Sequence, residues 1–156
     1  MTEYRITVPI KDEDIKKLNI RDIVYVAGTV YVARDRTHER LMEYARKGEK
    51  SPINLGGAVI YHAGPIVRKK NGEWKVIVAG PTTSTRMNKI TSQILEKYPI
   101  RMIIGKGGMN SEVAEAMKKY IAIYCHYTGG AAVLATKNIK KVMSVEWLDL
   151  GMPEAL

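Results

Sequence analysis

The stretch Gly80-Pro81-Thr82-Thr83-Ser84-Thr85-Arg86-Met87 decides the fold, because the chain changes there from a strand pattern to a helix pattern. An apolar run over residues 74–79 precedes it, and an amphipathic run over residues 86–97 follows it. A Gly-Pro turn and four hydroxyl residues between two such runs predict a strand-to-helix junction. Such junctions hold anions well, because backbone N–H groups are free there and the helix dipole is positive.

Two interpretations of the hydroxyl residues are open at this point. Ser and Thr often cap helices, so residues 82–85 could simply begin the helix that follows. The alternative is an anion site, to which Arg86 adds a planar cation suited to a carboxylate or a phosphate. The rest of the chain is needed to choose between them.

Length and composition predict a single domain over residues 1–156. The chain is 46% apolar and long enough to bury a substantial core. No run is apolar and long enough to cross a membrane, and residues 1–4 lack the pattern of a signal peptide, so we expect a cytoplasmic protein. Cys125 is the single cysteine, which excludes an internal disulfide and cannot alone hold zinc or an iron–sulfur cluster.

The charge of the chain is strongly positive, with 25 Lys and Arg residues against 16 acidic ones and a net charge of +9. Such a balance is compatible with nucleic-acid binding. However, the basic residues are scattered in short pairs such as Lys16-Lys17 and Lys118-Lys119, which favours solvated faces. A positive field also attracts small dianions, so composition alone does not choose between these partners.

The first half of the chain is rich in expected strands and contains one expected helix. The helix covers residues 36–46, with Asp35 as its cap and Gly48 as its end. Asn71-Gly72 between two strand-like runs predicts a hairpin. The expected strands cover residues 4–10, two segments within 20–32 that meet at Gly28 in a hairpin or bulge, 58–62, 66–68 and 74–79.

The second half alternates between strand and helix patterns. Strands are expected over residues 102–104, 121–125 and 142–147. Helices are expected over residues 86–97, from a cap at Asn110 or Ser111 to residue 119, and over residues 131–136, with a closing turn at 150–153. This alternation predicts a parallel sheet with right-handed crossovers. The hairpin-rich half has too few strands for a core of its own, so we expect it to form a second layer on the sheet.

Three cations follow expected strands: Arg34 after residues 31–33, Arg86 in the junction, and Lys106 in the turn Gly105-Lys106-Gly107-Gly108. Ligands of parallel sheets bind beyond the carboxyl ends of the strands, so the three together predict a site for a small, multiply charged anion. Taken singly, Lys106 could be an exposed turn lysine, and Arg34 could pair with Asp35 or Glu39. The turn is not a P-loop, because no Ser or Thr follows the lysine, and nucleotide hydrolysis is therefore disfavoured.

The three histidines give weaker signals. His38 lies four residues after Arg34, which suits anion binding or proton relay, but a solvated helix histidine is an equal alternative. His62 ends an expected strand and is a second-rank candidate. Cys125 and His126 point to opposite faces of a strand and cannot readily share a metal, so Cys125 is interpreted as a small buried hydrophobe.

Six motifs of this sequence, which follow one another along the chain, resemble the β subunit of class I, iron–sulfur-dependent fumarate hydratase. The same domain also occurs in L-tartrate dehydratase. The resemblance covers the chain from about residue 6 to the end, and residues 80–87 are its most specific part. The motifs are Gly28-Thr29-Val30-Tyr31-Val32-Ala33-Arg34-Asp35 with His38, Tyr61-His62-Ala63-Gly64-Pro65, residues 80–87, Gly105-Lys106-Gly107-Gly108, Gly129-Gly130-Ala131-Ala132 and Asp149-Leu150-Gly151-Met152.

The resemblance implies a fold and a partner. The fold is α/β, a three-layer β/β/α swivelling domain whose parallel sheet has helices on one side and a second β layer on the other. The partner is an α subunit that holds a [4Fe–4S] cluster on its own cysteines, so this chain is half of an enzyme and inactive alone. In the family another strand-forming segment follows Gly151-Met152, and this sequence lacks it.

The resemblance also implies roles for individual residues. Thr82 matches the proposed catalytic base, and Arg34, Arg86 and Lys106 match the groups that bind the substrate carboxylates. The cations suit a dicarboxylate dianion, which needs charge compensation in a site with little water. A threonine hydroxyl is a poor base unless it is activated, so Thr82 could instead position a carboxylate or a water. His38, Thr83, Gly105 and Gly107 are second-rank site residues.

The sequence thus predicts a hydro-lyase subunit for fumarate and (S)-malate in the tricarboxylic acid cycle. L-Tartrate is the alternative substrate of the same chemistry. A rival of another class is a basic module that binds nucleic acid or an anionic metabolite without catalysis. We expect neither nucleic-acid nor membrane binding, because no basic stripe interleaved with aromatic residues is present.

Overall fold

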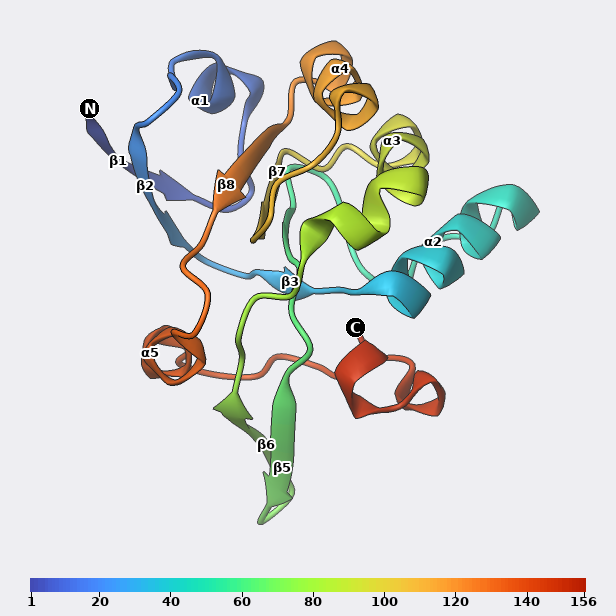
Figure 1. Ribbon diagram of the computed structural model, residues 1–156. Coiled ribbons are helices and arrows are strands. Elements are labelled where there is room, and N and C mark those ends of the chain that lie inside the picture. Colours follow the sequence, from blue (N-terminus) through green and yellow to red (C-terminus); the bar gives the residue numbers. More distant parts are fainter.

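A four-stranded parallel sheet lies at the centre of the computed structural model, which describes residues 1–156 (Figure 1). Its strands pair in the order in which they occur along the chain, with Val59 opposite Met102 and Met102 opposite Ile123. The predicted parallel sheet of an α/β protein is therefore confirmed. The strands are β3 (Tyr31–Val32), β4 (Val59–Tyr61), β7 (Met102–Gly105) and β8 (Ile123–His126).

Three helices cover one face of this sheet. Successive side chains of a strand point to opposite faces, so Ile60 and Ile103 pack into the core beneath the helices, where Leu41 and Ile94 are fully buried. The helices are α2 (Asp35–Lys47), α3 (Asn88–Lys97) and α4 (Ser111–Tyr120). As predicted, Gly48 ends α2 in the left-handed conformation, and the Asn110 side chain caps α4 by accepting from the Val113 N–H.

A smaller β layer packs on the opposite face. Val59 and Met102 meet Ile6, Ile10 and Ile15 there in a second core. This layer consists of β1 (Glu3–Thr7) and β2 (Ile23–Ala27), joined by α1 (Asp12–Lys16). The two strands are parallel, which the connection through α1 permits. The mixed α/β organisation is thus confirmed, whereas the swivelling type of domain stays a prediction.

The expected pairing across Gly28 is wrong, because β2 pairs with β1 whereas β3 pairs with β4. Gly28 instead lies where the chain passes from the small β layer into the central sheet. Its φ is +111°, and a Cβ at this position would lie 3.2 Å from the Val8 Cβ. Glycine is therefore needed for conformation and for close approach rather than for a hairpin turn.

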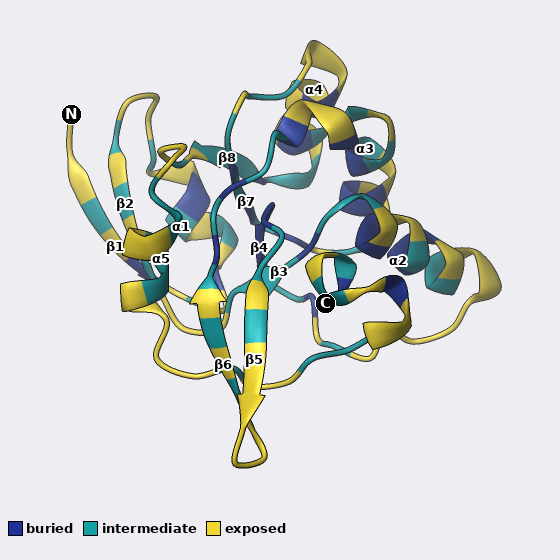
Figure 2. Cartoon of the chain, turned by 60° about the horizontal axis from the view of Figure 1, so that its bottom comes forward, coloured by how far each residue is buried: buried dark blue, intermediate teal, exposed yellow.

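The predicted hairpin forms, but it does not lie on the sheet. β5 (Ile66–Lys70) and β6 (Glu73–Val78) are antiparallel, and Asn71 and Gly72 both have positive φ, as a type I′ turn requires. In Figure 1 the hairpin extends away from the body, and Figure 2 shows that most of it is exposed. Only its base is buried, where Ala79 packs with Tyr61 and Ala63.

The C-terminal part departs from the prediction. After α5 (Ala132–Asn138), residues 142–147 form no strand, and their one backbone pairing joins Glu146 to Leu156 at 2.8 and 3.0 Å. Two short 3₁₀ turns, η2 (Leu148–Leu150) and η3 (Met152–Glu154), then pack against α2 (Figure 1). None of the helices is long and apolar enough to cross a membrane.

Candidate active site

The loop of residues 80–86 runs back between the carboxyl ends of β4 and β7. The Thr82 N–H donates to the His62 carbonyl at 2.7 Å, and the Ser84 N–H donates to the Lys106 carbonyl at 2.8 Å. The expectation that this loop leaves a strand of the parallel sheet is wrong, because β6 pairs only with β5. The loop nevertheless lies at the carboxyl edge of the sheet, where ligands of such sheets bind.

The hydroxyl residues of this loop do not cap a helix. Neither the 3₁₀ turn η1 (Ser84–Met87) nor α3 has a side-chain cap at its start. The hydroxyl groups of the loop make tertiary contacts instead. The Thr85 hydroxyl donates to the Gly108 carbonyl at 3.1 Å, and the Ser84 hydroxyl contacts the His62 ring at 2.9 Å. The capping interpretation is therefore wrong. Because two N–H groups of the loop are already bonded, the junction also has fewer free donors than the sequence predicts.

Arg34 and Arg86 meet at one carboxylate. Asp35 is the first residue of α2, and its Oδ2 lies 2.5 Å from the Arg86 Nη2 and 3.9 Å from the Arg34 Nε. Asp35 is thus not the helix cap, because its carboxylate faces the two guanidinium groups. Arg34 follows β3 after Ala33 and occupies the cap position of α2 without a capping side chain.

A second carboxylate reaches this site from the far end of the chain. Glu154 Oε1 lies 3.3 Å from the Arg34 Nε, and its Oε2 accepts from the Arg36 N–H at the start of α2 at 3.0 Å. The ion pair considered for Arg34 therefore forms with Asp35 and more closely with Glu154, not with Glu39. Part of the positive charge that the sequence predicts for a ligand is consequently offset within the chain.

Lys106 lies at the same edge, directly after β7. Its backbone N–H donates to the Thr82 carbonyl at 3.4 Å, and its side chain passes beside Gly129. Lys106 makes no salt bridge. It is half-buried, so the alternative of a fully exposed turn lysine is wrong.

Thr82 lies between these cations. It is half-buried, and its hydroxyl is 3.5 Å from the Arg86 Nη1. That distance makes a weak hydrogen bond at best, but it places a positive charge beside the hydroxyl. A nearby cation favours the deprotonated form of a hydroxyl, which is the kind of activation that a threonine base would need.

Two glycines keep the site compact. A Cβ at Gly105 would collide with the Ser84 hydroxyl and lie 3.3 Å from the Tyr124 hydroxyl. Gly107 has a φ of +80°, and a Cβ there would lie 3.1 Å from the Thr83 Cγ2. Both second-rank glycines and Thr83 therefore contribute space and backbone shape rather than a charged group.

Two histidines are completely buried next to these residues. The His38 Nδ1 lies 2.6 Å from the Arg34 carbonyl, and the His62 Nδ1 lies 2.9 Å from the Ser84 Oγ. Burial lowers the pKa of His38, and it lowers the pKa of His62 to about 2, with a smaller contribution from the neighbouring His38. The alternative of a solvated His38 is therefore wrong.

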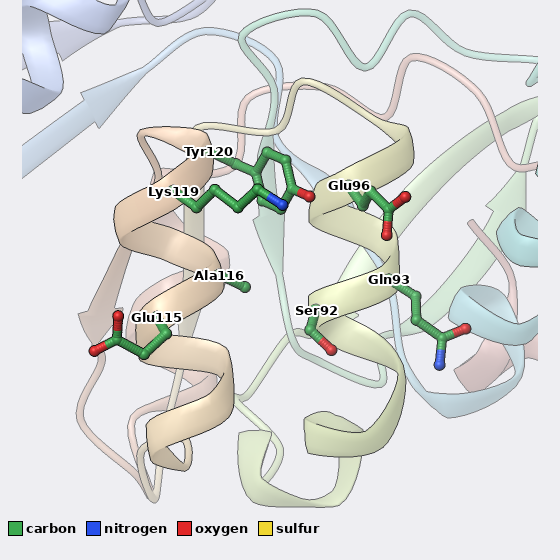
Figure 3. A pocket seen from close by; sticks show the side chains of 7 residues that line it. All are labelled: Ser92, Gln93, Glu96, Glu115, Ala116, Lys119 and Tyr120. Carbon is green, nitrogen blue, oxygen red and sulfur yellow. The ribbon is translucent and has the colours of Figure 1, made fainter.

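Sequence reasoning missed Asp35, Ser84 and Glu154 as parts of this site. Ser84 lies in the run of hydroxyl residues 82–85, and this run was the signal that could have pointed to it as a site residue. Glu154 gives no local signal, because only the folded chain brings it to Arg34. The structure also has a shallow hollow between α3 and α4 (Figure 3). This hollow lies towards the C-terminal ends of both helices, away from the carboxyl ends of the strands, so it does not belong to the site.

The sequence matches the family described as Fumarase C-terminus over residues 2–156. The chain belongs to this family. It is 39% identical over 151 residues to the L(+)-tartrate dehydratase subunit beta of Escherichia coli K12, covering 97% of this chain and 74% of that protein. It is 43% identical over 145 residues to a putative L(+)-tartrate dehydratase subunit beta of Methanocaldococcus jannaschii, covering 92% of this chain and 74% of that protein.

A third relative carries another name. A putative class I fumarate hydratase of Geobacillus stearothermophilus is 39% identical over 149 residues, which cover 95% of this chain and 28% of that protein. The chain is therefore a β subunit of the fumarase and tartrate dehydratase family. The relatives' names do not distinguish the two substrates.

The iron–sulfur cluster implied by the resemblance does not fit the residues of this chain. Cys125 on β8 is half-buried in the second core, and burial raises the pKa of its thiol to about 11. A cluster ligand must be a thiolate, which this environment disfavours. The structure holds no group of three or more His, Cys, Asp or Glu side chains placed for a metal ion.

Proposed function

We propose that this chain is the β subunit of a class I fumarate hydratase, which interconverts fumarate and (S)-malate together with an α subunit. The observation that carries the proposal is the meeting of Arg34 and Arg86 at Asp35, beyond the carboxyl ends of β3 and β4, in a member of the Fumarase C-terminus family. The [4Fe–4S] cluster is assigned to the α subunit.

Substrate binding is an exchange of carboxylates. A guanidinium binds a carboxylate through two parallel hydrogen bonds, and Arg34 and Arg86 already face the carboxylates of Glu154 and Asp35. The two carboxylates of the substrate would compete for the same cations. Lys106, which makes no salt bridge, adds a third positive charge, and an exchange of partners avoids leaving charges unpaired in a partly buried site.

Thr82 is proposed to act on the carbon skeleton of the substrate. Its hydroxyl lies beside Arg86, so a carboxylate bound by that arginine would bring the adjacent carbon near Thr82. In the dehydration of malate, the deprotonated Thr82 oxygen removes a proton from that carbon and becomes a hydroxyl. In the hydration of fumarate, the hydroxyl returns the proton to the carbon. The acid that protonates the departing hydroxyl of malate is expected from the α subunit.

L-Tartrate is the second candidate substrate. Two of the relatives described above are named as tartrate dehydratase subunits. Tartrate and malate share the two carboxylates and the hydroxyl that leaves, so the arrangement of Arg34, Arg86 and Thr82 suits both.

The test is anaerobic reconstitution with the α subunit, followed by parallel assays on (S)-malate and L-tartrate. Turnover of malate supports the first candidate, and preference for tartrate replaces it with the second. Absence of turnover of either substrate, with a cluster-loaded α subunit, would contradict the proposal. The chain alone is expected to show neither turnover nor iron–sulfur absorbance.

The non-catalytic rival has its own test. A nucleic-acid-binding module with a net charge of +9 would bind duplex DNA or RNA with an affinity that falls steeply as salt is raised. We expect no such binding by the chain at 0.15 M salt. Tight, salt-sensitive binding would favour the rival.

A further inference from the structure

A buried chain of polar groups lies beneath the substrate-binding residues and has no role in the proposed chemistry. It begins at the Tyr124 hydroxyl on β8, which donates to the Ser84 Oγ at 3.1 Å, and Ser84 contacts the His62 Nδ1 at 2.9 Å. The His62 and His38 rings lie edge to face with centroids 5.1 Å apart. The chain ends where the His38 Nδ1 meets the Arg34 carbonyl at 2.6 Å.

The groups at both ends of this chain determine where the protons lie. A carbonyl oxygen only accepts, so the His38 Nδ1 carries the hydrogen, and a neutral His38 then has an acceptor at Nε2. Ser84 accepts from Tyr124, and the other hydrogen-bond partner of its oxygen is the His62 Nδ1. The buried Ser84 hydrogen is therefore satisfied only when it is donated to that nitrogen. A neutral His62 therefore carries its hydrogen on Nε2 as a donor.

The two Nε2 atoms are complementary. Both are buried and neither has a hydrogen-bond partner, although buried polar atoms normally have one. One is a donor and the other an acceptor, on rings that contact each other. A proton added to His38 would go to its Nε2, a buried atom without an acceptor. A proton added to His62 would go to its Nδ1 and displace the hydrogen that Ser84 directs there, so charging either ring is costly in this buried site.

Each ring is attached to an element that carries substrate-binding residues. The His38 ring bonds to Arg34 at the start of α2. The His62 ring bonds to Ser84, and the His62 backbone carbonyl accepts from the Thr82 N–H, so two contacts join His62 to the loop of residues 80–86. A displacement of either ring would therefore move Arg34 relative to Thr82 and Arg86.

We propose that His38 and His62 are positioning residues, two neutral rings in complementary tautomers that hold the start of α2 and the loop of residues 80–86 in register for dicarboxylate binding. The role in binding rests on the proposed function. The assignment of the tautomers does not rest on the proposed function, so the tautomers and the role in binding can be tested separately.

The first test is nitrogen-15 NMR of the histidine rings in the full chain, in a His126→Gln background that removes the third, exposed ring. At pH 7 we expect two neutral rings, one protonated at Nδ1 and the other at Nε2. Ser84→Ala removes the donor to His62 and should change the spectrum of that ring alone. Two rings in the same tautomer, or a charged ring at pH 7, would overturn the proposal whatever the enzyme's substrate.

The second test uses the complex with its α subunit. His62→Gln and Ser84→Ala should each raise KM for the dicarboxylate about tenfold and change kcat much less, because binding geometry is disturbed while Thr82 is kept. His62→Asn places an amide near the position of Nδ1, so its KM should lie between that of the unchanged complex and that of His62→Gln. The control is Ser144→Ala, an exposed hydroxyl without a hydrogen bond. An unchanged KM, or equal loss of kcat in all three variants, would contradict a positioning role.

Discussion

Arg86 Nη2 lies 2.5 Å from Asp35 Oδ2, across 51 residues of sequence. This contact joins the loop between β4 and β7 to the start of α2, and it brings Arg86 towards Arg34. Two guanidinium groups would repel each other without a carboxylate between them. Asp35 therefore organises the two arginines, and under the proposed function a substrate carboxylate would replace part of its contacts.

Glu154→Gln should strengthen substrate binding. The carboxylate of Glu154 lies 3.3 Å from the Arg34 Nε and offsets the charge of that arginine, in competition with a substrate carboxylate. The amide of Gln can still accept from the Arg36 N–H but carries no charge. We expect KM for the dicarboxylate to fall about threefold at low salt. Glu115→Gln, an exposed carboxylate on α4 without a salt bridge, is the control. A higher KM for Glu154→Gln would mean that Glu154 mainly orients Arg34.

Gly105→Ala should destabilise the fold as well as the site. The added methyl group would collide with the Ser84 hydroxyl, next to the Tyr124 hydroxyl, in a place where nothing can give way cheaply. We expect the free energy of unfolding to fall by about 1–3 kcal/mol. The matched control is Gly129→Ala, whose methyl group would only reach ordinary contact with Lys106. Equal stabilities in urea for the two variants would show that the contact at Gly105 relaxes freely.

Stability should fall as the pH is lowered from 7 to 5. The pKa of His62 is about 2 in the folded chain and 6.5 when unperturbed, and burial also lowers the pKa of His38. Below about pH 6.5 the unfolded chain therefore binds protons that the folded chain does not, and the free energy of unfolding decreases. The slope approaches about 1.4 kcal/mol per pH unit for His62, and His38 adds to it in the same direction.

Urea unfolding at several pH values measures this slope. His62→Gln should remove the larger part of it, because the histidine with the pKa of about 2 no longer titrates. The carboxyl groups of Asp14, Asp22 and Asp149 have pKa values held below 3.8 by their hydrogen-bond partners, so they do not titrate in this window. A free energy of unfolding that is constant from pH 7 to 5 would contradict the assignment of neutral, buried rings.

Local signals in the sequence predicted local structure well. Asn71-Gly72 gave the hairpin, Gly48 the end of α2 and Asn110 the cap of α4, because each of these depends on neighbouring residues only. The parallel sheet also followed from the alternation of strands and helices. The pairing of β1 with β2 did not, because it depends on which strand edges meet in space.

The same distinction applies to the site. Arg34, Arg86 and Lys106 were found because each follows a strand-like run, and parallel sheets gather such positions at one edge. The loop of residues 80–86 was assigned to the wrong kind of strand, since nothing local shows that β6 turns away with β5. His38 is buried against His62, and Arg34 pairs with Glu154 from the far end of the chain. Neither contact can be inferred from neighbouring residues.

The central claim is that Arg86 binds a substrate carboxylate in a dehydratase. The most direct measurement compares the complex carrying Arg86→Ala with one carrying Arg46→Ala, an exposed arginine of α2 without a salt bridge, on (S)-malate and L-tartrate. We predict that Arg86→Ala lowers kcat/KM about 100-fold on the accepted substrate, with unchanged assembly, and that Arg46→Ala has no effect. Full activity of the Arg86→Ala complex would remove Arg86 from the site and contradict the account.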